Sequence, residues 1–337
     1  MDLRAAGLGF LGAAVVLALL VWVVGPSEVF AALGELTAPY AVAIVAAAAG
    51  WLVSWALALR TVLHVLEVRV SAWRAILLYL SAAFANNVTP FGQAGGEPFS
   101  ALLISRATSS EYERALAAVA SVDTINFFPS IALAFLGLGY YGAVLAVGDR
   151  VLLVFGIVTT LAVGVPTAGF LVWRNRDRVE AAVVRLVAPV ARVAGRWLPR
   201  VSPPSASTIR ERVAAFFHSL ETVAGSRRDL AIALSFSLLG WLSMAATLWL
   251  SLAAVGPQVP VAAVMVVVPV GAVASVTPLP GGAGGVEFAI VLLLVPIAGV
   301  TAEAATAAAL ISRAATFWLS TFLGGAAAGW LQGHPTG

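Results

Sequence analysis

The sequence predicts an all-α membrane protein that crosses the bilayer many times. Of its 337 residues, 61% are hydrophobic and 10% are charged, and the mean hydropathy is +0.99. Soluble domains carry nearer a quarter of charged residues. Apolar runs of about 18 residues or more recur along the chain, each long enough to span the hydrocarbon core as a helix. We therefore expect one transmembrane domain over residues 1–337.

Apolar runs define the individual spans. The first run reads as a retained span, because no clean small-residue cleavage site follows it. The 115–147 run is longer than one span needs, and we expect Pro129 to kink it. The expected spans are about 7–24, 38–59, 72–86, 115–147, 151–173, 229–252, 258–277 and 302–330.

Two shorter apolar pieces behave differently. Residues 97–106 and 286–298 each follow a glycine cluster and are too short to cross the membrane alone. They indicate broken or re-entrant helices. The predicted fold is therefore about eight long helices plus two half-helix hairpins.

The arginines set the expected orientation. Eleven of them lie in residues 174–228 and three more in residues 60–74. Because basic connections stay in the cytoplasm, we expect a multi-pass protein of the cell membrane with both termini cytoplasmic. In residues 179–198 of the cytoplasmic basic loop 174–228, apolar and basic residues alternate at roughly the period of an α-helix. This favours either an interfacial helix on an anionic lipid surface or an ordinary positive-inside loop.

The glycine clusters belong to an internal repeat. "VTPFGQAGGEPF" at residues 88–99 returns as "VTPLPGGAGGVEF" at residues 276–288. By the topology above, the two copies enter the membrane from opposite sides, as in transporters built from inverted repeats. We place the repeat halves at about 72–147 and 258–330.

Each copy interrupts a helix. Thr-Pro ends one helix, because proline lacks an N–H and biases its predecessor away from α conformation. The glycines let the backbone approach a ligand closely, and the free N–H groups of the next helix favour an anion such as phosphate. The alternative is helix packing, because Gly92/Gly96 and Gly281/Gly285 both satisfy GxxxG.

Four charged residues fall within or beside apolar runs. In the repeat alignment Glu97 matches Glu287 and Asp123 matches Arg313. Unpaired charges are costly inside a membrane, so these side chains should face a cavity or one another. We expect Asp123 and Arg313 to approach each other, either as part of the site or as a static pair.

Several chemistries are not expected. The chain has no cysteine, and its three histidines are far apart, so we expect no metal site. GxxxxGK[ST] does not occur, because the chain has no lysine. We therefore expect no cofactor, no catalytic residues and no nucleic-acid partner.

At these residues the sequence resembles the lysylphosphatidylglycerol synthase transmembrane family, also called flippase-like domain proteins. The resemblance covers the whole chain and rests on "NNVTPFGQAGGEPFSALLISR", "VTPLPGGAGGVEFAIVLLL" and "AAALISRAATF". It implies movement of lipid between leaflets, in a stand-alone member with no synthase domain and no aminoacyl transfer. Members often carry arginines in the first motif, where this chain has Gln93 and Ser100, so phosphate recognition is expected to be weaker or differently placed.

The function we expect is a lipid translocase that moves a phospholipid or polyprenyl-phosphate headgroup through a polar cavity near the midplane. Alternatives are an intramembrane lipid-linked transferase, an ion-coupled transporter of a small solute, and a membrane partner of a separate glycosyltransferase or synthase. The expected path residues are Asn86, Asn87, Thr89, Pro90, Gln93, Gly95, Gly96, Glu97, Asp123, Asn126, Thr277, Pro278, Gly284, Gly285, Glu287 and Arg313.

Overall fold

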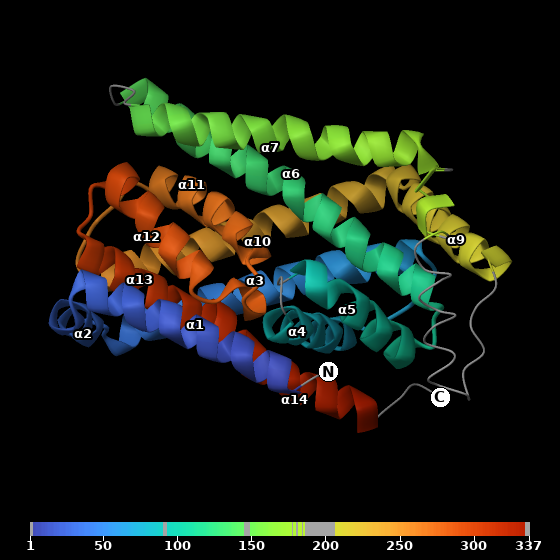
Figure 1. Cartoon of the computed structure of the whole chain (residues 1–337), viewed down its shortest axis with the longest axis horizontal. Coiled ribbons are helices and arrows are strands. Elements are labelled where there is room, and N and C mark those ends of the chain that lie inside the picture. Colours follow the sequence, from blue (N-terminus) through green and yellow to red (C-terminus); the bar gives the residue numbers. More distant parts are fainter. Residues whose placement is uncertain are drawn as a thin grey trace.

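The protein is a multi-pass bundle of α-helices (Figure 1). A computed structural model describes residues 3–89, 93–144, 149–176, 178, 179, 181–183, 185 and 206–333. Within those residues, six helices are long and apolar enough to cross a membrane: Ala38–Val65, Tyr112–Tyr141, Phe155–Arg174, Arg227–Ala254, Pro280–Ala298 and Ala302–Leu331. A bent pair near the N-terminus would make a seventh.

The first half of the chain contains α1 (Leu3–Val24), α2 (Pro26–Gly34), α3 (Ala38–Val65), α4 (Ala72–Val88), α5 (Gln93–Thr108), α6 (Tyr112–Val144) and α7 (Asp149–Arg174). The second half contains α9 (Ala206–Gly225), α10 (Arg227–Ala254), α11 (Val261–Ala272), η1 (Val273–Val276), η2 (Pro280–Gly282), α12 (Gly285–Ala298), α13 (Ala302–Arg313), the π-helical turn η3 (Ala314–Trp318) and α14 (Leu319–Gly333).

The N-terminal span ends in a sharp bend that the sequence did not suggest. Residues Ala14–Val24 and Pro26–Gly34 meet at 95°. Gly25 between them has φ +115°, a conformation open to glycine, and Pro26 starts the next helix with its fixed φ. The bend lays α2 against α13, with Val29 fully buried.

Both expected hairpins are present. α4 packs against α5, and α11 packs against α12. Figure 1 shows the α4–α5 hairpin in the half of the bundle that carries α9, and the α11–α12 hairpin in the half that carries α2. The two hairpins therefore point toward each other from opposite ends, as an inverted repeat requires.

Two of the eight expected spans are legs of these hairpins. The run at 72–86 forms α4, which has 17 residues, and the run at 258–277 forms α11, which has 12 residues before the chain tightens into η1. These helices are short because Thr89 and Thr277 leave helical conformation where each glycine cluster begins. The piece 286–298, which we expected to be too short to cross, is instead part of the span-length helix Pro280–Ala298. Two expected spans are thus lost and one is gained, which gives seven spans with the bent N-terminal pair and six without it.

Two long helices form the frame of the bundle. α3 packs along α10 over much of its length, and α6 contacts α5, α10 and α11. Pro129 lies inside α6 without ending it. α7 is different, because it packs mainly on α6. Only 6% of its most apolar 18-residue stretch is buried inside the protein.

Part of the basic loop folds back onto the bundle. α9 packs against α6, and two ion pairs fasten this region, Arg176 to Glu221 and Arg212 to Glu113, each at 3.3 Å. Most of residues 179–198, for which we expected an interfacial helix on anionic lipid, lies outside the described residues.

Candidate functional site

The tips of the two hairpins meet inside the bundle. Thr89 ends α4 by donating its hydroxyl to the Ala85 carbonyl at 2.8 Å. On the other side, Gly281 turns the chain with φ +54°. A Cβ added to Gly281 would lie 2.9 Å from the Asn87 Cα atom, so glycine is required for this close approach.

Asn87 fastens the first tip to the C-terminal span. Its Nδ2 group lies within hydrogen-bonding distance of the Phe317 carbonyl at 3.3 Å, the Ser320 hydroxyl at 3.2 Å and the Thr321 hydroxyl at 2.8 Å. Phe317 belongs to η3, and such π-helical turns are frequent at functional sites. The predicted path residue Asn87 thus joins the repeat halves.

The second copy contains a buried ion pair. Arg313 Nε donates to Glu287 Oε1 at 3.0 Å, and Arg313 Nη2 donates to the Gly281 carbonyl at 3.3 Å. The other Glu287 oxygen accepts the Gly284 N–H at 2.7 Å, and Glu287 is only 1% exposed. The N-terminus of α12, which we expected to hold a substrate anion, therefore carries the protein's own carboxylate.

The first copy has a corresponding pair. The carboxyl groups of Glu97 and Asp123 lie close enough to interact electrostatically. In the repeat alignment they occupy the positions of Glu287 and Arg313, so each hairpin holds its glutamate against the same position of the following helix. Two carboxyl groups cannot form an ion pair with each other, which makes the first pair chemically unlike the second.

This arrangement corrects one expectation. We expected Asp123 and Arg313 to approach each other, but the carboxylate partner of Arg313 is Glu287, within its own repeat half. Asp123 and Arg313 instead line one shared cavity.

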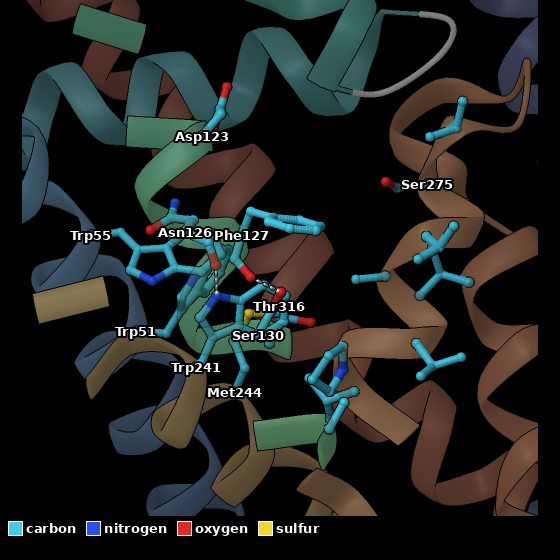
Figure 2. Close-up of a pocket in the computed structure, with 18 of the residues that line it drawn as sticks. Trp51, Trp55, Asp123, Asn126, Phe127, Ser130, Trp241, Met244, Ser275 and Thr316 are labelled. Carbon is cyan, nitrogen blue, oxygen red and sulfur yellow. Dashed lines mark hydrogen bonds between the residues drawn. The ribbon is translucent and has the colours of Figure 1, made fainter. Parts of the chain in front are cut away.

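The shared cavity has a volume of about 440 Å³ and lies beside the hairpin tips. Its polar lining includes Asn86, Asn87, Asp123, Asn126, Ser130, Ser275, Ser312, Arg313 and Thr316. Figure 2 shows five of these polar residues, Asp123, Asn126, Ser130, Ser275 and Thr316, together with large aromatic rings from α3, α6 and α10.

An aromatic cluster walls one side of the cavity. Trp55 packs edge-to-face against Trp51, Tyr79 and Trp241, with ring centroids 5.7, 6.3 and 5.4 Å away. The Trp241 indole N–H donates to the Asn126 carbonyl at 2.8 Å, which locks the cluster to α6. The cluster is thus a rigid wall.

Two hydrogen-bond donors beside this wall have no partner in the described part of the chain. They are the Trp51 indole N–H and the Asn126 side-chain amide, both buried. The Asn126 Oδ1 atom is already engaged, because it accepts from the Ser237 hydroxyl at 2.7 Å. A ligand rich in hydrogen-bond acceptors would satisfy these donors.

The cavity has an apolar rim. Val165 of α7 and Val273 and Val276 of η1 line it, yet they are 44%, 46% and 62% exposed. Val165 lies near the middle of the Phe155–Arg174 span, and η1 lies at a hairpin tip. The exposed apolar rim of the cavity therefore lies beside the middle of a candidate membrane span.

The comparison with protein families decides the classification. The family model described as "Lysylphosphatidylglycerol synthase TM region" matches residues 8–324. The chain belongs to this family.

Three relatives match this chain over most of their own length. A UPF0104 membrane protein of Methanothermobacter thermautotrophicus is 28% identical over 94% of this chain and 90% of its own. A second UPF0104 protein of that organism is 23% identical over 93% of this chain and 91% of its own. A UPF0104 protein of Pyrococcus horikoshii is 22% identical over 80% of this chain and 81% of its own.

In this family member, the predicted path residues fall into three groups. Asn86, Asn87, Asp123, Asn126 and Arg313 line the cavity. Thr89, Gly96, Glu97, Thr277, Pro278, Gly284, Gly285 and Glu287 build the hairpins and stand behind the lining. Pro90 lies outside the described residues, and for Gln93 and Gly95 the structure describes only the backbone.

Glycines in the second group have packing roles. A Cβ on Gly96 would meet the Asn86 backbone at 2.5 Å, and one on Gly285 would meet Thr277 at 3.0 Å. At these two positions glycine therefore allows close helix packing, which was the alternative interpretation of the GxxxG pattern. The contact at Gly96 also holds Asn86 beside the cavity.

The aromatic wall was missed from the sequence. Trp51, Trp55 and Trp241 are buried within spans. Tryptophan in membrane helices is enriched at the two membrane–water interfaces. Three tryptophans near the centres of predicted spans are therefore unusual, and this could have indicated an aromatic cluster inside the bundle.

Proposed function

We propose that this protein moves a phosphate-bearing lipid between the leaflets of the membrane, with the headgroup in the cavity and the tails in the bilayer. The observation that carries the proposal is a cavity with a polar patch beside the hairpin tips and an exposed apolar rim on α7 and η1. A carrier for a water-soluble solute needs its cavity to reach the aqueous phases, whereas a lipid tail needs an exit into hydrocarbon.

The rim suits an acyl or polyprenyl chain. Val165, Val273 and Val276 present only methyl groups at the opening. α7 forms one wall through Val158, Leu161 and Val165, and most of its remaining surface faces lipid. A tail that lies between α7 and η1 would stay in an apolar environment while the headgroup moved inside.

The cavity suits a headgroup. Its volume of about 440 Å³ corresponds to about 15 water molecules, enough for a phosphate and a small polar substituent. Arg313 and the donors on Asn126 and Trp51 supply N–H groups for phosphate oxygens, and Asp123 can accept from an amine or hydroxyl. These contacts replace the hydration that a headgroup would otherwise lose in hydrocarbon.

The test is lipid exchange in proteoliposomes that contain tail-labelled fluorescent phosphatidylglycerol. Dithionite bleaches only the outer-leaflet label unless the lipid exchanges between leaflets. We expect the native protein to expose nearly all label and Val273→Trp, which fills the rim, to slow this exchange strongly. Val42→Trp is the matched control, because Val42 is a 69% exposed residue of α3 that does not line the cavity.

Two results would contradict the proposal. One is native protein that bleaches like protein-free vesicles with every phosphate-bearing lipid tried. The other is Val273→Trp protein with the native rate, which would show that the lateral opening is not used.

A further inference from the structure

A second cavity, of about 540 Å³, lies between the end of α3 and the start of α10. It shares no lining residue with the cavity described above. Its lining is Arg60, Thr61, His64, Arg69, Val70, Asp229, Ile232 and Phe236. Because α3 and α10 pack along each other over much of their length, this pocket is preformed.

One side of the α3–α10 pocket is basic. Arg60 and His64 are one helical turn apart on α3, so they share a face. Arg69 comes from the turn after α3, where Glu67 reverses the chain with φ +62°. Arg60 Nε donates to the Val70 carbonyl at 3.0 Å, which fixes its guanidinium beside the pocket.

The acidic residue of the pocket, Asp229, forms no close ion pair with these arginines among the described residues. Asp229 accepts the Ser226 hydroxyl at 2.6 Å, at the start of α10. Among the described residues, neither Arg60 nor Arg69 has a carboxylate oxygen within 4.0 Å. The pocket therefore keeps two guanidinium groups for a ligand.

The opposite side is apolar and runs toward the membrane interior. Ile232 and Phe236 lie one turn apart on α10, and Ile232 is exposed. Trp73, at the start of α4 close after Arg69, is also exposed. Exposed tryptophan is typical of the membrane–water boundary, which places the basic side at headgroup depth and the apolar side below it.

We propose that the α3–α10 pocket binds the phosphate of an anionic phospholipid, with one acyl chain along Ile232 and Phe236. Two arginines match phosphate oxygens in charge and geometry, and basic pockets between helices at the membrane surface recognise such headgroups. This lipid is a resident ligand, distinct from the lipid that passes through the central cavity. It bridges the two frame helices at the end of the bundle that carries α9 (Figure 1).

The experiment is native mass spectrometry of the full chain in detergent, titrated with phosphatidylglycerol or with phosphatidylcholine. We expect the native protein to retain phosphatidylglycerol preferentially. Arg60→Gln and Arg69→Gln should each weaken retention roughly fivefold, and the double variant about thirtyfold. The matched control is Arg106→Gln, which removes an equal charge from an exposed residue at the end of α5, outside the pocket.

The acyl chain and the phosphate source are tested separately. Ile232→Asn should also weaken phosphatidylglycerol retention, because an amide would face the chain, and millimolar inorganic phosphate should leave retention unchanged. Retention in the double arginine variant equal to native, or equal loss in Arg106→Gln, would overturn the site. Displacement by inorganic phosphate, or native retention in Ile232→Asn, would show a site for soluble anions instead. Size-exclusion profiles equal to native confirm that each variant is folded.

Discussion

Glu287 and Arg313 form a buried ion pair 3.0 Å apart, and the same carboxylate caps α12 through the Gly284 N–H. One side chain thus closes a helix end, neutralises a guanidinium and joins α12 to α13. At the equivalent positions of the first repeat stand Glu97 and Asp123, so the two halves share a geometry but not a charge.

The Glu287–Arg313 pair is expected to be a stability element. Glu287→Gln leaves the guanidinium without its counter-charge and should destabilise the protein by about 3–5 kcal/mol. Replacing both partners by glutamine should cost less than Glu287→Gln alone. Thermal unfolding in detergent measures both effects. Glu221→Gln breaks the exposed pair with Arg176 and should cost at most about 1 kcal/mol. Equal losses in Glu221→Gln and Glu287→Gln would contradict this role.

The close approach of the hairpin tips predicts a steric effect at Gly281. In Gly281→Ala, the alanine would have to adopt a positive φ, and its Cβ atom would collide with Asn87. We expect the free energy of unfolding to fall by about 2–4 kcal/mol. Gly299 serves as a control for the cost of positive φ without a steric clash. Its φ is +65°, and nothing lies within 4 Å of a Cβ atom added to it. Gly299→Ala should therefore cost only about 1 kcal/mol. The idea fails if the two variants unfold at the same temperature.

Asn87 is expected to hold the repeat halves together. Asn87→Leu removes the amide that reaches η3 and α14, and we expect a loss of about 1–3 kcal/mol. The same change at Asn175, whose amide bonds one turn back within its own exposed helix end, should cost less than about 0.5 kcal/mol. Denaturant or thermal unfolding compares them, and an Asn87→Leu variant as stable as the native protein would exclude the tie.

The carboxyl pair of the first repeat is expected to serve transport. If Asp123 accepts a hydrogen bond from the headgroup, Asp123→Asn should slow lipid exchange by about one to two orders of magnitude. Thr124→Val is a control next in sequence, because the Thr124 hydroxyl bonds the Ala120 carbonyl on the exposed side of α6. The dithionite assay compares the two rates at equal reconstitution. An unchanged rate in Asp123→Asn would remove this carboxyl from the path.

Sequence patterns predicted the parts of this fold that depend on neighbouring residues. Thr-Pro and clustered glycines mark the hairpin tips, because proline and glycine act on their own backbone. The repeat likewise gave the correspondence of Glu97 with Glu287. Charge partners were harder to predict: Arg313 was paired with the wrong residue because its contact with Glu287 depends on how α12 lies against α13.

The aromatic wall depends on long-range packing. Trp55 and Trp241 are distant in sequence and meet only because α3 lies along α10. The bend at Gly25 depends on neighbouring residues, so it could have been predicted from the Gly-Pro dipeptide, which marks a turn. The π-helical turn after Arg313 leaves no such signal in the sequence, and its Phe317 carbonyl accepts from Asn87, which is distant along the chain.

The exposed helix α7 gives the bilayer a direct influence on the cavity. Most of its surface is not covered by the rest of the protein, and an apolar helix face gains little from exchanging acyl chains for protein side chains. Separating α7 from the bundle therefore breaks few protein contacts, and lipid fills the space. The width of the lateral opening then varies with acyl-chain length and packing, so membrane composition would tune how readily a tail enters beside Val165.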